Sequence, residues 1–210
     1  MLRAVLAPGP ANPCLAGGVR SENLSLPAEQ RRARELLRLS RDYLLEQQRV
    51  LSALARSAEF VTGGDAAVRL LTETSAKQKG VERVSLWRFV EGRDALQCVD
   101  LYDRASGRHS SGAVLRAAQY PRYFEAIGSE EAIVADDALS DELTRELADS
   151  YLRPDGIVSL LAVPIRLGGV VAGVLCHEHV GEPAFWTPEE RMFAIAMGSL
   201  ATLALERGAR

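Results

Sequence analysis

The amino-acid sequence predicts an α+β fold, in which the helices are segregated from an antiparallel sheet. Two long apolar runs, 158–166 and 170–180, are joined by Gly168-Gly169, and adjacent glycines supply the positive φ angles of a tight hairpin. The longest helix-forming segments lie before and after the strand-like runs. Strands joined by tight turns pair antiparallel, and helices then cover the sheet as a separate layer.

The N-terminal half of the chain begins with helix signals. Residues 28–60 contain neither proline nor glycine and are rich in good helix formers, which predicts one amphipathic helix. Gly63-Gly64 ends it, and Asp65 caps a second helix that runs to about Lys79. The apolar stripe of the first helix is broken by Ser40 and Gln47, and it consists of Leu36, Leu37, Tyr43, Leu44, Val50, Leu51 and Leu54.

Four further strands and two short helices are expected before the hairpin. The strands are 83–90, 95–102, 109–116 and 132–135, and the helices are 120–125 and 139–152, the latter capped by Ser140. Thr187 and Pro188 then begin a last helix, 188–206, with Glu189 and Glu190 in its first turn. This helix is apolar nearly all round, so we expect it to be buried partly against another chain.

Composition excludes several classes of protein. The 210-residue chain has a formal net charge of −3 and lacks the basic surplus of most nucleic-acid binders. No apolar run approaches the roughly 20 residues that cross a bilayer, so no membrane partner is expected. The apolar run at 4–7 is shorter than the core of a secretion signal, which favours a cytoplasmic protein with a disordered leader at 1–27. Three cysteines indicate no disulfide framework.

Taken in order, these segments resemble a GAF domain, a small-molecule sensor module of bacterial signalling proteins. The matching stretches are VSLWRFV, YPRYFEAI, YLRPDGIVSLLAVPI and GVVAGVLCHEHVGEPAFWTPEE, which place the domain at 65–206. The resemblance implies an antiparallel sheet of about five or six strands, with dimerisation helices on one face and short helices over a ligand pocket on the other. Ala162 departs from the pattern, since many relatives have Asp there, and no effector domain follows 188–206. The chain is therefore expected to act in trans or to be the sensing part of a longer protein.

The resemblance also indicates where a ligand would bind. Aromatic and apolar walls with a few polar anchors are typical of small-ligand sites. The candidate wall residues are His109, Arg116, Tyr120, Tyr123, Phe124, Tyr151, Ser159 and His177. An equally open alternative is that several of these side chains fill the pocket and leave no space for a ligand.

The segment Cys176-His177-Glu178-His179 invites a second comparison. His177 and His179 lie two apart on a strand and face the same way, whereas Cys176 faces the other. In cyclic-nucleotide-binding GAF domains a Lys-Asp ion pair ties the strand end to the last helix. By resemblance, that structural brace consists of His179, Phe185 and Glu189 in this chain. The missing Asn-Lys pair weakens the case for a cyclic nucleotide.

No catalytic, metal or cofactor site is expected. A closed zinc site needs four ligands, and beyond His177 and His179 the chain offers only His109. Segment 139–155 lacks the cysteine that attaches a bilin in one branch of the family. Free methionine sulfoxide reductases are GAF enzymes with clustered cysteines, but Cys98 and Cys176 fit no such motif and are better read as buried small hydrophobes.

The sequence thus predicts a non-enzymatic cytoplasmic sensory or regulatory protein that binds a small molecule or a partner protein. It is expected to be a homodimer through 28–60 and 188–206, to signal through those helices, and to act on a kinase or other effector in trans. The alternative is a degenerate scaffold that binds no ligand and only dimerises or docks, and a reductase-like enzyme ranks third. A solvated helix face accounts for Arg31, Arg32, Arg34, Arg38 and Arg41.

Overall fold

The N-terminal helical segment consists of two helices, and not of the single helix predicted over 28–60. In the computed structural model, which describes residues 27–208, α1 (Ala28–Ala55) is followed by α2 (Ala58–Thr62). Ser57 has extended backbone angles, and its hydroxyl accepts a hydrogen bond from the Phe60 amide at 3.3 Å. A serine in this conformation caps a new helix, which is why the chain breaks there. Residues 1–26 of the predicted leader lie outside the described residues.

The chain divides into two compact units, Met1–Tyr43 and Leu44–Arg210, so that the boundary falls inside α1. In the second unit, Leu54 of α1 is buried in the core, and Val50 and Leu51 pack against it.

The predicted antiparallel sheet is confirmed. Its strands run in the order β3-β2-β1-β7-β6-β5, with β4 also paired to β2. The predicted strand 109–116 is interrupted at Gly112, where φ is 91°, and so gives two short strands, β3 and β4. The bounds are β1 (Arg83–Phe89), β2 (Ala95–Asp103), β3 (Arg108–Ser110), β4 (Val114–Arg116), β5 (Ile133–Ala135), β6 (Ile157–Leu167) and β7 (Val170–Val180).

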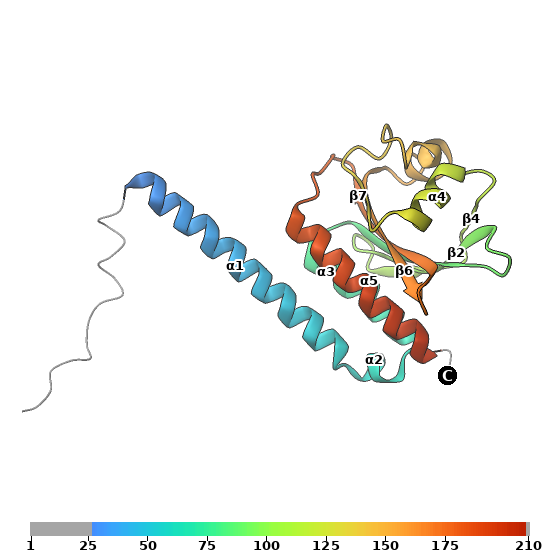
Figure 1. Ribbon diagram of the computed structural model, residues 1–210, viewed down its shortest axis with the longest axis horizontal. Helices are drawn as coiled ribbons and strands as arrows, with labels where there is room; N and C mark the ends of the chain where they lie inside the picture. The colour runs from blue at the N-terminus through green and yellow to red at the C-terminus, as the bar shows by residue number, and fades with distance from the viewer. Residues whose placement is uncertain (1–26, 209–210) are drawn as a thin grey trace, which may run out of the picture. The chain divides into compact units, whose positions relative to one another are not determined.

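Helices cover the two faces of the sheet differently (Figure 1). α3 (Asp65–Lys79) and α5 (Pro188–Gly208) pack side by side on one face, which we call the helix face. α4 (Pro121–Ser129) and two short helical turns lie over the other, which we call the lid face. Each face has its own apolar cluster: Leu175 belongs to the cluster on the helix face, and Cys176 to the cluster on the lid face. This alternation follows from the two-residue period of a strand.

The prediction of a single helix over 139–152 is wrong. The chain there forms a 3₁₀ turn, η2 (Arg145–Leu147), and a π-helical turn, η3 (Ala148–Leu152). The Asp141 carboxylate accepts a hydrogen bond from the Leu143 amide at 2.9 Å, and the Thr144 hydroxyl donates to the Ala138 carbonyl at 2.8 Å. Side-chain bonds of this kind compete with the regular helical ladder.

α5 begins as the sequence predicts. The Thr187 hydroxyl accepts from the Glu190 amide at 3.2 Å, and the Glu190 carboxylate accepts from the Thr187 amide at 2.9 Å, which is a capping box. Phe193 and Met197 are buried against the sheet, whereas Met192 and Leu203 are 64% and 44% exposed.

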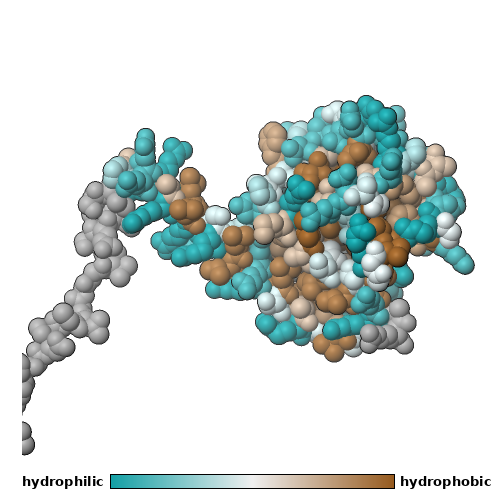
Figure 2. Space-filling model, in the orientation of Figure 1, coloured by the Kyte–Doolittle hydropathy of each residue, from teal (hydrophilic) through white to brown (hydrophobic). Residues whose placement is uncertain are grey.

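Apolar and polar residues are mixed on the surface of the second unit that Figure 2 shows. Within residues 27–208, no helix is long and apolar enough to cross a membrane.

Candidate ligand site

The lid face carries an aromatic cluster that is closed to solvent. Trp87 of β1 and Tyr123 of α4 are each 1% exposed, and Tyr120, which precedes α4, is 6% exposed. The Tyr123 hydroxyl lies 3.5 Å from Cys176 Sγ on β7, and Trp87 meets Tyr151 of η3 edge to face, with ring centroids 5.8 Å apart. These side chains fill the space between the sheet and the elements above it.

A segment that we call the lid (residues 136–156) closes over this cluster and is fastened by polar side chains. The Tyr151 hydroxyl donates a hydrogen bond to Glu178 Oε1 on β7 at 2.6 Å. Arg83 of β1 pairs with Asp155 of the lid at 3.0 Å and with Glu178 at 3.3 Å. One carboxylate on the sheet therefore anchors the lid twice, directly through Tyr151 and through Arg83.

The electrostatics of this anchor follow from burial. Glu178 is fully buried, and loss of water raises the pKa of its carboxyl group, although the Arg83 guanidinium and the Tyr151 hydroxyl oppose the shift. Burial also raises the pKa of Tyr151 well above its ordinary value, and the nearby Glu178 adds to the effect. The phenol therefore remains a hydrogen-bond donor at physiological pH.

The rest of the lid is held to α4. The Glu146 carboxylate accepts a hydrogen bond from the Arg122 amide at 3.0 Å, which places a negative charge at the N-terminus of α4. The hydroxyls of Tyr120 and Ser150 lie 2.7 Å apart. The lid and α4 thus form one layer, which is joined to the sheet through the Glu178 anchor, through Tyr123 and, at its first residue, through Asp136.

Four of the eight predicted wall residues share the lid face: Tyr120, Tyr123, Phe124 and Tyr151. Arg116 is exposed on β4. The other three, His109, Ser159 and His177, point away from the lid cluster.

The contacts of these three residues explain where they lie. His109 Nδ1 is 2.9 Å from Asp100, whose carboxylate also accepts a hydrogen bond from Thr72 of α3 at 2.5 Å. The Ser159 hydroxyl donates to the Asp136 carbonyl at 2.7 Å and accepts from the Ala184 amide at 2.9 Å. These bonds tie the helix face and the loop before α5 to the sheet.

His177 lies on the helix face and is fully buried. Its Nε2 is 2.8 Å from the Ser75 hydroxyl of α3. Burial lowers the pKa of this histidine to about 3, so the ring is neutral at physiological pH.

The brace is predicted between His179 and Glu189, but in the structure His179 contacts Glu82 instead. His179 Nδ1 lies 3.0 Å from Glu82, just before β1, and the His179 ring lies 4.9 Å from the Trp186 ring. Phe185 is 85% exposed and Glu189 is half-buried at the start of α5. His179 therefore joins the end of β7 to β1 and to the residue before the Thr187 cap.

The sequence reasoning missed the anchor itself. No motif in the sequence indicates a role for Glu178, Arg83, Asp155 or Trp87. The sequence nevertheless contains a signal for this site. Glu178 lies two residues after Cys176 on the same strand, so both side chains face the same side of the sheet. A carboxylate that faces an apolar layer needs a partner there.

The two cysteines of the domain are buried, and their thiols are not activated as nucleophiles. Cys98 and Cys176 are each 3% exposed on the lid face. Burial raises the pKa of the Cys98 thiol to about 12 and that of Cys176 further still. Because the thiolate is the nucleophile, neither group is activated in this conformation. Within residues 27–208, no three His, Cys, Asp or Glu side chains are arranged to hold a metal ion.

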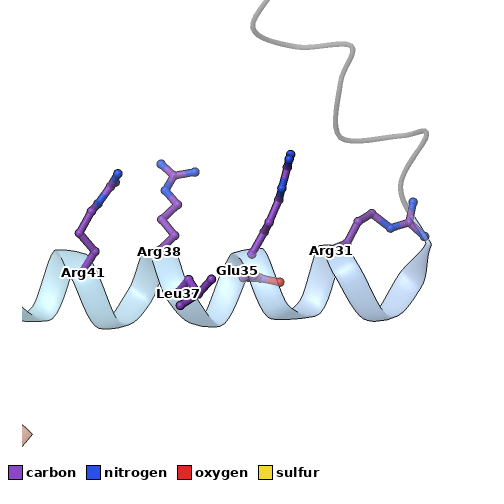
Figure 3. Close-up of a pocket in the computed structure, with 6 residues that line it drawn as sticks. Arg31, Glu35, Leu37, Arg38 and Arg41 are labelled. Carbon is purple, nitrogen blue, oxygen red and sulfur yellow. The ribbon is translucent and has the colours of Figure 1, made fainter.

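A hollow on α1 offers no enclosed site. Its lining residues all belong to this one helix, and Figure 3 shows Arg38 and Arg41 extending from it near Leu37. Asp42 lies 3.0 Å from the Arg41 guanidinium and 3.8 Å from that of Arg38. The hollow is therefore a surface between exposed side chains of one helix.

A single antiparallel sheet with a helical layer on one face and a fastened lid on the other defines a small α+β module. The chain belongs to the GAF domain family, which matches residues 64–205. GAF domains are typically sensory modules of signalling proteins and are generally non-catalytic. A comparison with curated proteins found no significant match.

Solved structures share this fold at low sequence identity. The GAF domain of a phosphoenolpyruvate-protein phosphotransferase from Acinetobacter has a TM-score of 0.58 at 15% identity, covering 80% of this chain and 95% of that one. A methyl-accepting chemotaxis protein has a TM-score of 0.60 at 20% identity, covering 75% and 95%. A free methionine-R-sulfoxide reductase from Neisseria meningitidis, solved with its substrate, has a TM-score of 0.58 at 13% identity, covering 78% and 87%. At these identities the likeness concerns the fold.

Proposed function

We propose that this chain is a non-enzymatic sensory or regulatory GAF protein that responds to a small molecule or a protein partner at its lid. The observation that carries the proposal is the Glu178 anchor, in which a buried carboxylate holds the lid through Tyr151 and Arg83. The lid lacks a long regular element, which is a feature of segments that open locally, although its Leu147 and Leu152 are buried in the cluster beneath it. Opening would uncover Trp87 and Tyr123, an aromatic wall beside a charged anchor.

We further propose that a second copy of the chain covers its exposed apolar stripes. On α1, Leu37 and Leu44 are 71% and 42% exposed and lie seven residues apart, and Leu36 beside them is 60% exposed. On α5, Met192 and Leu203 are exposed on the side turned away from the buried Phe193 and Met197. Apolar stripes of this kind favour self-association of helices into a bundle, through which a change at the lid would reach an effector in trans.

The α1 stripe offers a matched test of dimerisation. Leu36 lies in the stripe and is 60% exposed, and Leu45, nine residues later and 45% exposed, lies on the opposite side of the helix. Leu36→Glu is expected to convert a dimer into a monomer in size-exclusion chromatography with light scattering, and Leu45→Glu is expected to leave the dimer intact. On α5, Met192→Glu is compared in the same way with Val170→Glu, which lies in the hairpin and is 60% exposed. A monomeric wild-type protein at high concentration would overturn this part of the proposal.

A scaffold without a ligand is the second candidate, and the closed cluster favours it. Trp87, Tyr123 and Cys176 leave the lid face packed in the described conformation. Native mass spectrometry and absorbance spectra of freshly purified protein separate the two functions. A retained small mass, or its release on denaturation, supports the sensor, and bare polypeptide at dimer mass supports the scaffold.

The enzymatic alternative has less support. A reductase needs an accessible thiolate, and both Cys98 and Cys176 are buried with raised pKa values. Consumption of free methionine sulfoxide by the wild type, abolished by Cys98→Ser or Cys176→Ser, would reverse this conclusion.

A further inference from the structure

Four consecutive residues of β7, Cys176 to His179, connect the two layers of the domain through alternate side chains. Towards the lid face, Cys176 Sγ lies 3.5 Å from the Tyr123 hydroxyl of α4, and Glu178 accepts from Tyr151 at 2.6 Å. Towards the helix face, His177 lies 2.8 Å from Ser75 of α3, and His179 lies 3.0 Å from Glu82. The strand period of two produces this alternation. One short stretch of backbone therefore holds polar contacts to both layers.

The lid contacts are those most sensitive to movement of the lid. Glu178 is fully buried, and its charge is balanced by Arg83 and by the Tyr151 hydroxyl. If the lid moves away, Tyr151 and Asp155 leave together, and Arg83 loses one of its two carboxylate partners. A buried carboxylate that loses its partners must be re-paired or reached by water, so the strand that carries it cannot keep the same environment.

The helix contacts of the same stretch reach α3 and the start of α5, and α5 is one of the helices expected to carry a signal. Ser75 lies in α3, where it is fully buried beside His177. The His179 ring packs on Trp186, directly before the Thr187 cap of α5. The Trp186 amide also donates to the carboxylate of Asp136, the first residue of the lid, at 2.9 Å, so α3 is the element that only β7 joins to the Glu178 anchor. Because side chains in a packed core have few alternative positions, a small shift of β7 is passed to α3 and to the start of α5.

We propose that Cys176 to His179 form a mechanical relay, in which release of Glu178 from the lid repositions Ser75 of α3 and Trp186 before α5. The relay rests on the proposed function, because it supplies the route by which an event at the lid reaches the helices. It assigns separate roles to the two histidines and the glutamate, and none of these roles is that of a metal ligand or a reaction centre. Glu178 binds the lid, His177 contacts Ser75 of α3, and His179 packs on Trp186 before α5.

Amide hydrogen exchange of the full-length protein, followed by mass spectrometry, tests the relay without any ligand. Tyr151→Phe removes the hydroxyl that binds Glu178, and Glu178→Gln removes its charge. We expect both variants to raise exchange at least about threefold in peptides that cover α3 and the start of α5, besides the lid itself. The matched control is Ser150→Ala, which releases the lid from Tyr120 but leaves the Glu178 pair intact. It is expected to change exchange in the lid and α4 alone.

A double-mutant cycle sharpens the test. Tyr151 and Ser75 lie in different layers, so independent sites would give additive effects of Tyr151→Phe and Ser75→Ala on exchange. The relay predicts that the double variant departs from additivity by more than about twofold. Additive effects, or exchange in Tyr151→Phe that is unchanged in α3, would overturn the relay. Such a failure is distinct from that of the proposed function, which is decided by native mass spectrometry and oligomeric state of the wild type.

Discussion

The Tyr151–Glu178 hydrogen bond makes a quantitative prediction about stability. Tyr151→Phe removes one hydroxyl and keeps the ring that packs edge to face on Trp87. The lost bond is 2.6 Å long and ends on a fully buried carboxylate. Hydrogen bonds to charged groups contribute about 1.5–3 kcal/mol, so we expect the free energy of unfolding to fall by about 2 kcal/mol. With a urea m-value of about 2 kcal/mol/M, the midpoint would shift by about 1 M.

Tyr120→Phe is the matched control for this measurement. The same chemical change removes a 2.7 Å contact with Ser150, an exposed and uncharged partner. The expected loss is about 0.5–1 kcal/mol, because a partly buried hydrogen bond between neutral groups contributes less than one to a buried charge. Urea unfolding followed by far-ultraviolet circular dichroism gives both values. If the two variants lost equal stability, or if Tyr151→Phe were more stable than wild type, the role of Glu178 as anchor would be refuted.

Three further predictions concern other buried groups. Burial lowers the pKa of His177 to about 3, from about 6.5 in the unfolded chain, so below pH 6.5 the unfolded chain binds more protons than the native protein. The free energy of unfolding is therefore unaffected by this group above pH 6.5 and falls by about 1 kcal/mol per pH unit below it. His177→Gln should make the urea midpoint less dependent on pH between about pH 6.5 and pH 5. Gly173→Ala would place a Cβ 2.0 Å from the Trp87 carbonyl oxygen, and we expect a loss of several kcal/mol or insoluble expression, judged by thermal unfolding. Cys98 and Cys176 should react with a maleimide at least about 100-fold more slowly in the native protein than in urea, and equal rates would contradict their burial.

The hairpin and the last helix could be predicted because their signals are local. Gly168 and Gly169 both have positive φ angles, 57° and 83°, as the diglycine turn requires. The Thr187–Glu190 capping box is made within four residues. The antiparallel sheet followed from the tight turns, and the family from the four matching stretches in their order along the chain.

The site was harder to predict because it depends on which face of the sheet each strand residue occupies and on partners that are far apart in sequence. A shift of register lies between Ile157 and Ser159, and a one-residue change moves a side chain to the opposite face. Ser159 was therefore expected on the pocket wall but binds the loop before α5 instead. The partner of His179, Glu82, lies 97 residues away in sequence, and no local pattern indicates that pairing.

The division of 139–152 into two short turns has a similar origin. The acidic first turn suggested a capped helix, but the Asp141 and Thr144 side chains bind backbone groups next to them. The tertiary contacts of Glu146, Tyr151 and Asp155 then fix the path of the lid. Helix propensity alone does not include these bonds.

The most direct test of the relay measures whether a change at the lid reaches the helices of a dimer. A nitroxide label at Glu206→Cys, with Cys14→Ser to remove the Cys14 thiol, reports the distance between α5 helices of two copies by pulsed electron resonance. The relay predicts one distance distribution in the otherwise wild-type protein and a shift on the order of 1–2 Å when Tyr151→Phe is added. Identical distributions in the two proteins, with a dimer present in both, would contradict it.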